Sequence, residues 1–315
     1  TFAFGFTCDW LLAIDFLPIA NSKKPLAGRL RKTDNRQQML LFKKAADLHS
    51  HLEKVRHEGI SIGFVPTMGA LHEGHLSLIR QAKQATGCCV CSIFVNPTQF
   101  NDPSDLEKYP RTPERDMELL LSEGCDVLFM PPVEEVYPPG KNPSVPVELG
   151  FLDKPMEGAH RPGHFTGVAQ VVSRLLDLVQ PDNLYLGQKD FQQAAIVREM
   201  LEQTQSPVKL VVCATVREAD GLAMSSRNVR LTPEQRAKAP LIYQTLLEAK
   251  QKLPSQSPRQ IEEAAMKNLS SDGMLPEYFE VVDGKTLRSV EAFESVDFVV
   301  ACTAVKLGDV RLIDN

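Results

Sequence analysis

Short apolar runs recur along the first two thirds of the chain, and segments with helical spacing separate them. Uninterrupted apolar runs are typical of parallel strands that helices cover on both faces, because a strand with one solvated face alternates apolar and polar residues. Alternation of such strands with helices predicts βαβ units and an α/β fold. The expected strands are Leu40–Phe42, Ile60–Val65, Cys88–Val95, Asp126–Met130, Asn183–Leu186 and Val208–Val216.

The segments between these runs carry helix signals. Lys44–Glu58 has apolar residues at helical spacing and is followed by Gly59, a common helix stop. Thr112 and Pro113 supply a cap and a first-turn proline for the helix that ends near Glu123. The further expected helices are Leu76–Ala85, Val168–Val179 and one that starts at Phe191. The pattern predicts a Rossmann-like parallel sheet with helices on both faces.

A different pattern begins after the last of these strands. Residues 217–228 are polar and predict a hinge. Two helices and three alternating runs follow, which predict a small α+β domain. We therefore expect one domain over residues 39–215 and a second over 216–315 that closes on the first as a lid. The expected elements are the helices Thr232–Gln251 and Arg259–Leu269 and the strands Tyr278–Val282, Asp297–Ala304 and Val310–Ile313.

Residues 1–38 do not fit either pattern. Their first half is aromatic and apolar and their second half is polar and basic, which reverses the order of a secretory signal. An organellar transit peptide stays open, because Arg29, Arg31 and Arg36 lie in the second half. We favour Met39 as the natural start, with residues 1–38 as an extra segment outside the functional fold.

Composition narrows the function classes. With a formal net charge of -5 and a pI near 5.9, the 315-residue chain does not resemble a general nucleic-acid binder. No apolar run of about 18 residues predicts a membrane span. Cys88, Cys89 and Cys91 crowd into one apolar run without the spacing of a metal site, so we expect buried free thiols, no protein metal centre and a reducing, cytoplasmic location.

The stretch Pro66–His75 carries the most specific chemistry. It follows a predicted strand, turns through Gly69 and leads into a helix, so His72, His75 and backbone N–H groups should lie at the carboxyl edge of the sheet, where anions bind. On their own, the two histidines could equally be a turn residue and a polar residue of the first helical turn. The His-x-Gly-His pattern resembles the signature of the nucleotidyltransferase superfamily with the HIGH motif, which implies chemistry at the α-phosphate of ATP.

Polar residues follow the other predicted strands as well. Asn96 and Gln99 come after the second of the strongly apolar strands, and Gly187–Asp190 comes after the fifth expected strand. Asp190 and Gln193 fit a helix-capping arrangement, whereas Lys189 has no such structural role and suits a phosphate. Two more loops complete the set, Gly158–Gly167 and Met224–Asn228. Each loop alone is also compatible with ordinary turn chemistry.

Taken together, these loops resemble the pantoate–β-alanine ligase family. The resemblance runs from about Met39 to the end of the chain, through the segments 66–75, 94–100, 109–112, 161–167, 187–193 and 224–228. It implies that pantoate reacts with ATP to give pantoyl-adenylate and pyrophosphate, and that β-alanine then attacks to give pantothenate and AMP. Many members have Glu where this chain has Gln188.

The resemblance also implies roles for individual residues. His75, in the position of the proton donor, would act on the phosphates with His72, Lys189, Ser225, Ser226 and Arg227. Gln99 and Gln193 would hold pantoate, Gln99 would also serve β-alanine, and Asn96, Tyr109 and His164 would lie nearby. The implied ATP site comprises Met68, Gly69, Ala70, Leu71, His72, Glu73, Gly74, His75, Gly187, Gln188, Lys189, Asp190, Val216, Met224, Ser225, Ser226 and Arg227.

Mg²⁺ is expected to arrive with the ATP phosphates, with Asp116 or Glu114 as open candidates to assist it. The resemblance favours a homodimer with ATP, pantoate and β-alanine as small-molecule partners. The acidic pI and the lack of a long apolar run argue against nucleic acid and membrane as partners. Two alternatives differ in function. An adenylyltransferase of the same superfamily would need cations near Gln99 for a phosphorylated acceptor, and a regulatory nucleotide-binding module would need fewer aligned charges than His75, Lys189 and Arg227 provide.

Overall fold

The computed structural model describes residues 38–100, 106–140, 147–253, 255–270 and 273–315. Six parallel strands form its larger sheet in the order β1-β4-β3-β2-β5-β6. Their bounds are β1 Leu40–Phe42, β2 Ile62–Thr67, β3 Cys88–Ile93, β4 Val127–Phe129, β5 Asn183–Gly187 and β6 Lys209–Cys213. The predicted α/β class with a parallel sheet is confirmed, and every strand expected in this half of the chain is present.

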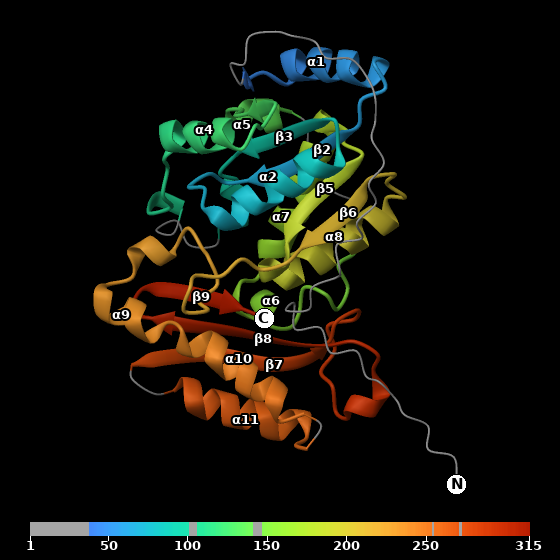
Figure 1. The fold of residues 1–315 in the computed structure, drawn as a ribbon. Helices are drawn as coiled ribbons and strands as arrows, with labels where there is room; N and C mark the ends of the chain where they lie inside the picture. The colour runs from blue at the N-terminus through green and yellow to red at the C-terminus, as the bar shows by residue number, and fades with distance from the viewer. Residues whose placement is uncertain (1–37, 101–105, 141–146, 254, 271–272) are drawn as a thin grey trace, which may run out of the picture.

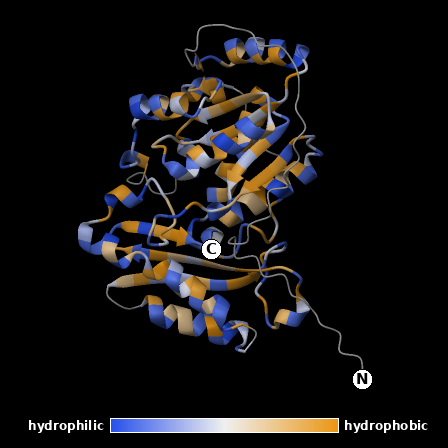
Figure 2. Cartoon of the chain, in the orientation of Figure 1, coloured by the Kyte–Doolittle hydropathy of each residue, from blue (hydrophilic) through white to orange (hydrophobic). Residues whose placement is uncertain are grey.

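Helices cover both faces of this sheet (Figure 1). On one face, α1 (Ala45–His57), α7 (His164–Val179) and α8 (Phe191–Gln203) share a core with alternate strand residues such as Phe64 and Val90. On the other face, α2 (Glu73–Ala85) and α4 (Pro113–Ser122) pack on the remaining positions. Apolar side chains therefore leave the strands on both sides, which accounts for the uninterrupted runs in the sequence. Figure 2 shows these strands as mostly hydrophobic and the outer helices as mixed.

The order in which successive strands are added to the sheet reverses between β2 and β5. From β2 the chain moves outward through β3 and β4, then returns to the opposite side of β2 to form β5 and β6. Such a switch point leaves a crevice at the carboxyl ends of the two central strands, where ligands of open α/β sheets bind. The residues that follow β2 and β5 are the predicted phosphate-binding loops.

A second sheet contains β7 (Met274–Asp283), β8 (Val299–Leu307) and β9 (Val310–Asp314), which are antiparallel. The helices α10 (Leu241–Gln251) and α11 (Pro258–Leu269) pack on one face of this sheet. The other face forms an apolar cluster with residues of α8 and of the segment before α6 (Glu157–His160). In Figure 1, α6 and the carboxyl end of β9 lie between the two sheets.

The structure corrects three details of the sequence prediction. The helix expected over Thr232–Gln251 is two helices, α9 (Pro233–Lys238) and α10, because Pro240 at their junction has no N–H to donate to the helical ladder. The connection after β4 contains the short helix α5 (Val133–Val136), which is not among the expected helices, and residues 141–146 lie outside the described residues. Helix α7 begins four residues before the predicted Val168.

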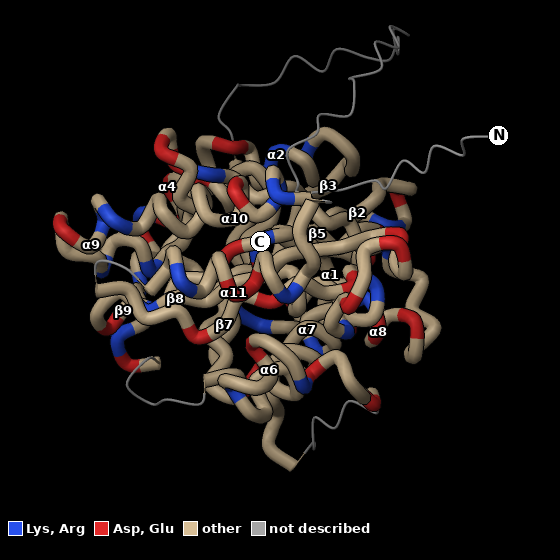
Figure 3. Tube along the Cα trace, turned by 90° about the horizontal axis from the view of Figure 1, so that it is seen from below, with Lys and Arg blue, Asp and Glu red and all other residues tan. Residues whose placement is uncertain are grey.

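Three expectations from the composition, on membrane spans, charge distribution and cysteines, can be compared with the described part of the chain. None of its helices combines the length and the apolar character needed to cross a bilayer. Basic and acidic positions are interspersed along the trace in Figure 3. Six cysteines, at positions 88, 89, 91, 125, 213 and 302, are buried free thiols, whereas Cys8 lies outside the described residues.

A close approach between α7 and the loop after β3 fixes the position of Gln99. The short 3-10 helix η1 (Pro97–Gln99) lies against Gly167, where an added Cβ would come within 2.6 Å of the Thr98 carbonyl oxygen. The Asn96 amide donates to the Gly167 carbonyl from the other side. Only a residue without a side chain fits this contact.

We therefore expect Gly167→Ala to displace η1 and to lower the free energy of unfolding by about 1–3 kcal/mol, the usual cost of overpacking. Chemical denaturation monitored by circular dichroism measures this change. Thr166→Ala, an exposed substitution one residue earlier in the same helix, is the matched control and should stay close to wild type. Equal stability of the two variants would contradict the close contact.

Candidate active site at the carboxyl edge of the large sheet

A pocket with a volume of about 210 Å³ opens where β2, β5 and β6 end. Most of the predicted site residues line it, although they come from segments that are far apart in the sequence. Those lining it are Met68, His72, Gly74, His75, Gln99, Tyr109, Gly187, Lys189, Asp190, Gln193, Val216, Met224, Ser225, Ser226 and Arg227. The predicted residues Gly69, Ala70, Leu71, Glu73, Gln188, Asn96 and His164 do not line it.

Asp116 holds the turn between β2 and α2. Gly69 and Ala70 have positive φ angles of 81° and 50°, so the chain reverses sharply there. The two carboxylate oxygens of Asp116 accept the N–H groups of Ala70 (2.9 Å) and Leu71 (2.8 Å), and the Thr112 hydroxyl lies 3.2 Å from one of them. Asp116 is therefore committed to the backbone. Glu114, the other residue considered for metal binding, is exposed and lies outside the pocket lining.

The two histidines satisfy the backbone at the start of α2. The Gly74 N–H donates to His72 Nδ1 (3.2 Å), and the His72 N–H donates to His75 Nδ1 (3.3 Å). Because both Nδ1 atoms accept, each neutral ring carries its proton on Nε2. Gly74 makes room for this arrangement, since a Cβ there would come within 2.8 Å of the His72 ring. The rings lie with their centroids 4.1 Å apart.

The surroundings favour the uncharged form of both rings. Burial, and then the positive charge of Lys189, lower the pKa of His72 to about 4. Burial, followed by His72 and Lys189, lowers the pKa of His75 to about 3. Near neutral pH the pocket thus presents two neutral imidazoles whose donors are Nε2–H groups.

Lys189 enters the pocket from the other central strand. It belongs to the 3-10 turn η2 (Gln188–Asp190) that follows β5, and its ammonium lies 3.7 Å from Asp190 Oδ1. The Asn315 amide donates to the carbonyls of Gln188 (3.1 Å) and Lys189 (2.8 Å) and so fixes this turn. The predicted capping by Asp190 is not observed: the residue occupies the N-cap position of α8, but its side chain makes no cap hydrogen bond.

Gln99 is oriented by a buried amide neighbour. Asn96 donates to Gln99 Oε1 (3.3 Å), and the Gln99 Nε2 group lies 3.1 Å from Met68 Sδ. Asn96 also accepts from the Thr98 N–H and from the Tyr137 hydroxyl. Its polar atoms are therefore engaged within the protein, and its contribution to the pocket is the orientation of Gln99.

The loop 224–227 lines the same pocket as the histidines. The Met224 N–H donates to the Val216 carbonyl, and the Arg227 N–H donates to Ser225 Oγ. The Tyr109 hydroxyl lies 3.3 Å from Ser226 Oγ. These bonds bring two hydroxyls and a guanidinium to the same pocket as His72, His75 and Lys189.

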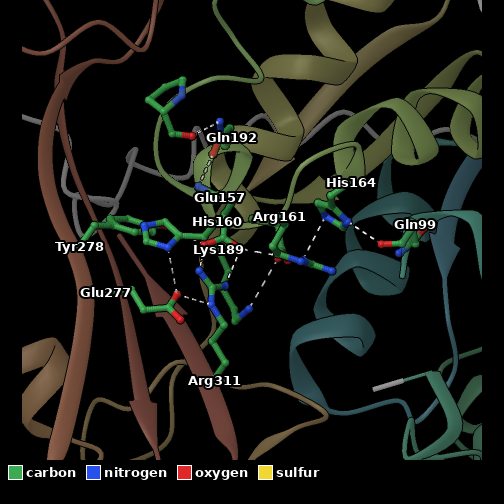
Figure 4. Close-up of polar contacts among 12 residues, drawn as sticks. Gln99, Glu157, His160, Arg161, His164, Lys189, Gln192, Glu277, Tyr278 and Arg311 are labelled. Atoms are coloured by element: carbon green, nitrogen blue, oxygen red, sulfur yellow. Dashed lines mark hydrogen bonds and ion pairs between the residues drawn. The ribbon is translucent and has the colours of Figure 1, made fainter. Parts of the chain in front are cut away.

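His164 lies beside this pocket, in a smaller cavity of about 40 Å³. Its Nδ1 is 2.8 Å from the Gln99 carbonyl oxygen and its Nε2 is 3.1 Å from Arg161 Nη1 (Figure 4). A carbonyl can only accept and a guanidinium can only donate, so His164 carries its proton on Nδ1. Burial, and then Arg161, lower its pKa to about 4.

Sequence reasoning missed the residues that hold this site from outside the motifs. Asp116 was considered only as a metal ligand, although its place in the first turn of a helix was visible in the sequence. The Thr215 hydroxyl lines the pocket and has no hydrogen-bond partner in the described structure. Asn315 carried no sequence signal, because its contacts lie more than 120 residues away in the chain.

Comparison with known proteins decides the family. The sequence profile of pantoate-beta-alanine ligase matches residues 40–315. The chain belongs to this family. Among its relatives, the pantothenate synthetase of Porphyromonas gingivalis is 49% identical over 279 residues, which span 88% of this chain and 98% of the relative. That of Bacteroides thetaiotaomicron is 48% identical over 273 residues, 85% of this chain and 95% of the relative.

Solved structures agree with this assignment. The crystal structure of pantothenate synthetase from Thermus thermophilus has a TM-score of 0.80 and 41% identity, and the match covers 88% of this chain and 98% of that one. The ligase from Francisella tularensis, complexed with beta-gamma ATP and β-alanine, has a TM-score of 0.71 and 33% identity, with 88% and 97% covered. The predicted family, fold class and reaction are confirmed: the chain is a ligase that condenses pantoate with β-alanine to pantothenate in an ATP-dependent reaction.

The lowered histidine pKa values predict how stability depends on pH. Below pH 6.5 the unfolded chain binds protons at His72, His75 and His164 that the folded chain does not, so the free energy of unfolding should fall from pH 6.5 toward pH 4. The slope is at most about 1.4 kcal/mol per pH unit for each histidine. Thermal unfolding midpoints measured from pH 7.5 to 5 report it.

His75→Asn separates the histidine contribution from that of the carboxylates. Asn keeps an oxygen near the position of Nδ1 for the His72 N–H and does not titrate, so the loss of stability between pH 6.5 and 5 should be smaller than in wild type. An identical pH dependence in wild type and variant would show that His75 does not contribute.

Proposed function

We propose that the pocket described above is where the family reaction takes place, and that it proceeds through pantoyl-adenylate. The observation that carries the proposal is the convergence of His72, His75, Lys189, Ser225, Ser226 and Arg227 on one pocket at the switch point of the sheet. Donors and cations in a partly closed site stabilise charge that develops during phosphoryl chemistry. A regulatory module that only binds nucleotide would not need this many aligned groups.

In the first step, a pantoate carboxylate oxygen attacks the α-phosphorus of ATP, and the bond from that phosphorus to the bridging oxygen of the leaving pyrophosphate breaks. His72 and His75 would donate their Nε2–H groups to phosphate oxygens. Lys189 and Arg227 would supply positive charge as negative charge moves onto the leaving group, with Ser225 and Ser226 as further donors. In this assignment His75 stays in the position of the proton donor, and its pKa of about 3 makes it a neutral Nε2–H donor before the phosphates bind.

Neutral amides suit the pantoate side of the pocket. We assign Gln99 and Gln193 to the pantoate hydroxyl and carboxyl groups, because an arginine paired with the carboxylate would occupy the lone pairs that must attack phosphorus. The apolar wall formed by Phe94, Val171 and Val172 matches the methyl groups of pantoate. In the described residues the Gln99 side chain bonds Asn96 and Met68 rather than a cation, which disfavours a phosphorylated acceptor there.

In the second step, the β-alanine amine attacks the carbonyl carbon of the adenylate, and AMP leaves. The amine has an ordinary pKa near that of lysine, roughly 10, and must lose a proton before it attacks. We assign Gln99 and Tyr109 to this substrate. Asn96 and His164 would act indirectly, by holding Gln99.

The nucleotide would lie between the loops at the ends of β2, β5 and β6. Met68, Gly74, Gly187, Val216 and Met224 line this part of the pocket. Gly69, Ala70, Leu71, Glu73 and Gln188 would act by shaping the turns. Glu73 itself is paired with Arg80, away from the lining.

No group of three or more potential ligand side chains occurs in the described residues. We therefore assign Mg²⁺ to the ATP phosphates rather than to a site that the protein builds alone. Asp190 is the carboxylate that lines the pocket. Such an ion typically keeps several waters and binds through phosphate oxygens, where it neutralises charge.

Three further assignments complete the proposal. We place a hinge at residues 216–228, between a nucleotide-binding domain over 39–215 and a lid domain over 216–315. A homodimer is supported by the edge strand β1, where Leu40 and Leu41 are 41% and 43% exposed, because exposed apolar edges favour pairing. A cytoplasmic location is supported by the six buried free thiols of the described residues.

Exchange of labelled pyrophosphate into ATP tests the adenylate route. With pantoate present and β-alanine absent, we expect label to enter ATP, and AMP should accumulate only after β-alanine is added. Omitting pantoate is the control. Pantothenate formation without any pantoate-dependent exchange would contradict a reversible adenylation step in this pocket.

His75→Ala and Lys189→Ala should each reduce pantoate-dependent exchange by about 100-fold or more, because each removes a donor to the developing charge. Far-ultraviolet circular dichroism should show that the fold is kept. His49→Ala and Lys54→Ala are matched controls on the exposed side of α1 and should keep wild-type rates. Near-normal exchange in either pocket variant would contradict its assigned role.

A further inference from the structure

Glu157 lies where the small sheet contacts the larger domain. This carboxylate of α6 is buried, with 8% of the residue exposed. Arg311 of β9 binds both of its oxygens, at 2.6 and 2.7 Å, and the Tyr278 hydroxyl of β7 donates to one of them at 2.8 Å (Figure 4). Burial opposes ionisation of Glu157, but these hydrogen bonds outweigh it and hold the pKa below its usual value. Glu157 is therefore a fixed anion.

A continuous series of contacts leads from Glu157 to the active site. Arg161 Nη1 lies 3.8 Å from Glu157 Oε2 and 3.1 Å from His164 Nε2. The Nδ1–H of His164 donates to the Gln99 carbonyl at 2.8 Å. Glu157, His164 and Gln99 are each less than 10% exposed, and the Arg161 side chain that links them is 25% exposed.

The direction of the hydrogen bonds makes the series specific. Arg161 is positive and can only donate, so it requires an unprotonated Nε2 on His164 and thereby places the proton on Nδ1. Only that tautomer can bond the Gln99 carbonyl. Asn96 holds the Gln99 side chain from the other side. The backbone and the amide of Gln99 are thus held by separate groups.

We propose that Glu157, clamped by Arg311 and Tyr278, is a positioning residue for pantoate, which it acts on through Arg161, His164 and the backbone of Gln99. The proposal rests on the assignment of Gln99 to pantoate made above. Small displacements of a substrate-holding group can reduce the rate of a reaction strongly. The small sheet would then set the pantoate site as well as cover it. A purely structural interface, by contrast, would affect stability without distinguishing between substrates.

Tyr278→Phe and Arg311→Lys test this distinction. The first removes one hydroxyl from Glu157, and the second keeps the charge but loses the two-pronged contact. We expect the KM for pantoate to rise by roughly three- to tenfold, as for loss of one hydrogen bond of ordinary strength, while the KM for ATP stays within about twofold. Steady-state kinetics, with thermal unfolding of each variant, give both quantities.

Lys306→Met is the matched control. Lys306 lies on the neighbouring strand β8 and pairs with Glu277 at 2.8 Å, within the same charge cluster, but it does not contact Glu157. It should leave both KM values unchanged. An unchanged pantoate KM in folded Tyr278→Phe, or an equal rise in the KM for ATP and for pantoate, would overturn the proposal. If Arg311→Lys fails to fold, the single-hydroxyl change in Tyr278→Phe still decides the matter.

A second substitution tests whether the contacts act in series. His164→Asn keeps an amide donor for the Gln99 carbonyl and removes the acceptor for Arg161, so its pantoate KM should rise as in Tyr278→Phe. The pantoate KM of the double variant Tyr278→Phe/His164→Asn should be no higher than that of either single variant. A rise equal to the product of the two single effects would show that the two sites act independently and would overturn the series. Wild-type enzyme without pantoate-dependent exchange would instead contradict the proposed function, so the two failures are distinguishable.

Discussion

The pocket at the carboxyl edge of the large sheet depends on how the chain satisfies the backbone N–H groups where β2 turns into α2. The first N–H groups of a helix have no partner within the helix, and leaving a buried one unpaired costs about 1–3 kcal/mol. Asp116 accepts from Ala70 and Leu71, while the rings of His72 and His75 accept from the backbone of the first helical turn. Four N–H groups are thus paired by side chains. This pairing fixes both the turn and the rings.

The same bonds determine the chemistry that the rings can perform. Since Nδ1 of His72 and His75 is occupied by the backbone, their protons point toward the pocket from Nε2. Neutral donors can bind phosphate without the cost of burying additional charge, and in the proposed reaction Lys189 and Arg227 would supply the positive charge separately. His164 shows the opposite arrangement, with its proton on Nδ1, because its neighbours are a carbonyl and a guanidinium. Hydrogen-bond partners, rather than residue type, decide what each histidine does.

These distinctions explain what could be predicted from the sequence. Apolar runs revealed the parallel sheet, because burial on both faces leaves no alternation, and polar residues after the strands revealed the pocket. The short helix α6 was not predicted, since four residues are too few to show helical periodicity. The contact of Glu157 in this helix was not predicted either, because its partner Arg311 lies 154 residues later in the chain. The tautomers of His72, His75 and His164 could not be predicted, since they depend on which atoms contact each ring in the folded chain.

The last strand, β9, connects the small sheet to residues that support the pocket. Within β9 and the residue after it, Arg311 bonds Glu157, Asp314 pairs with Arg217, and the Asn315 amide holds the carbonyls of the Lys189 turn. One short segment therefore contacts the support of the Lys189 turn and the series of groups that leads to Gln99. Because a strand in a paired sheet is stiff, displacement of β9 would move both supports together. The small sheet thus contacts both the turn that carries Lys189 and the series of groups that leads to Gln99, which a cover held only by apolar contacts would not do.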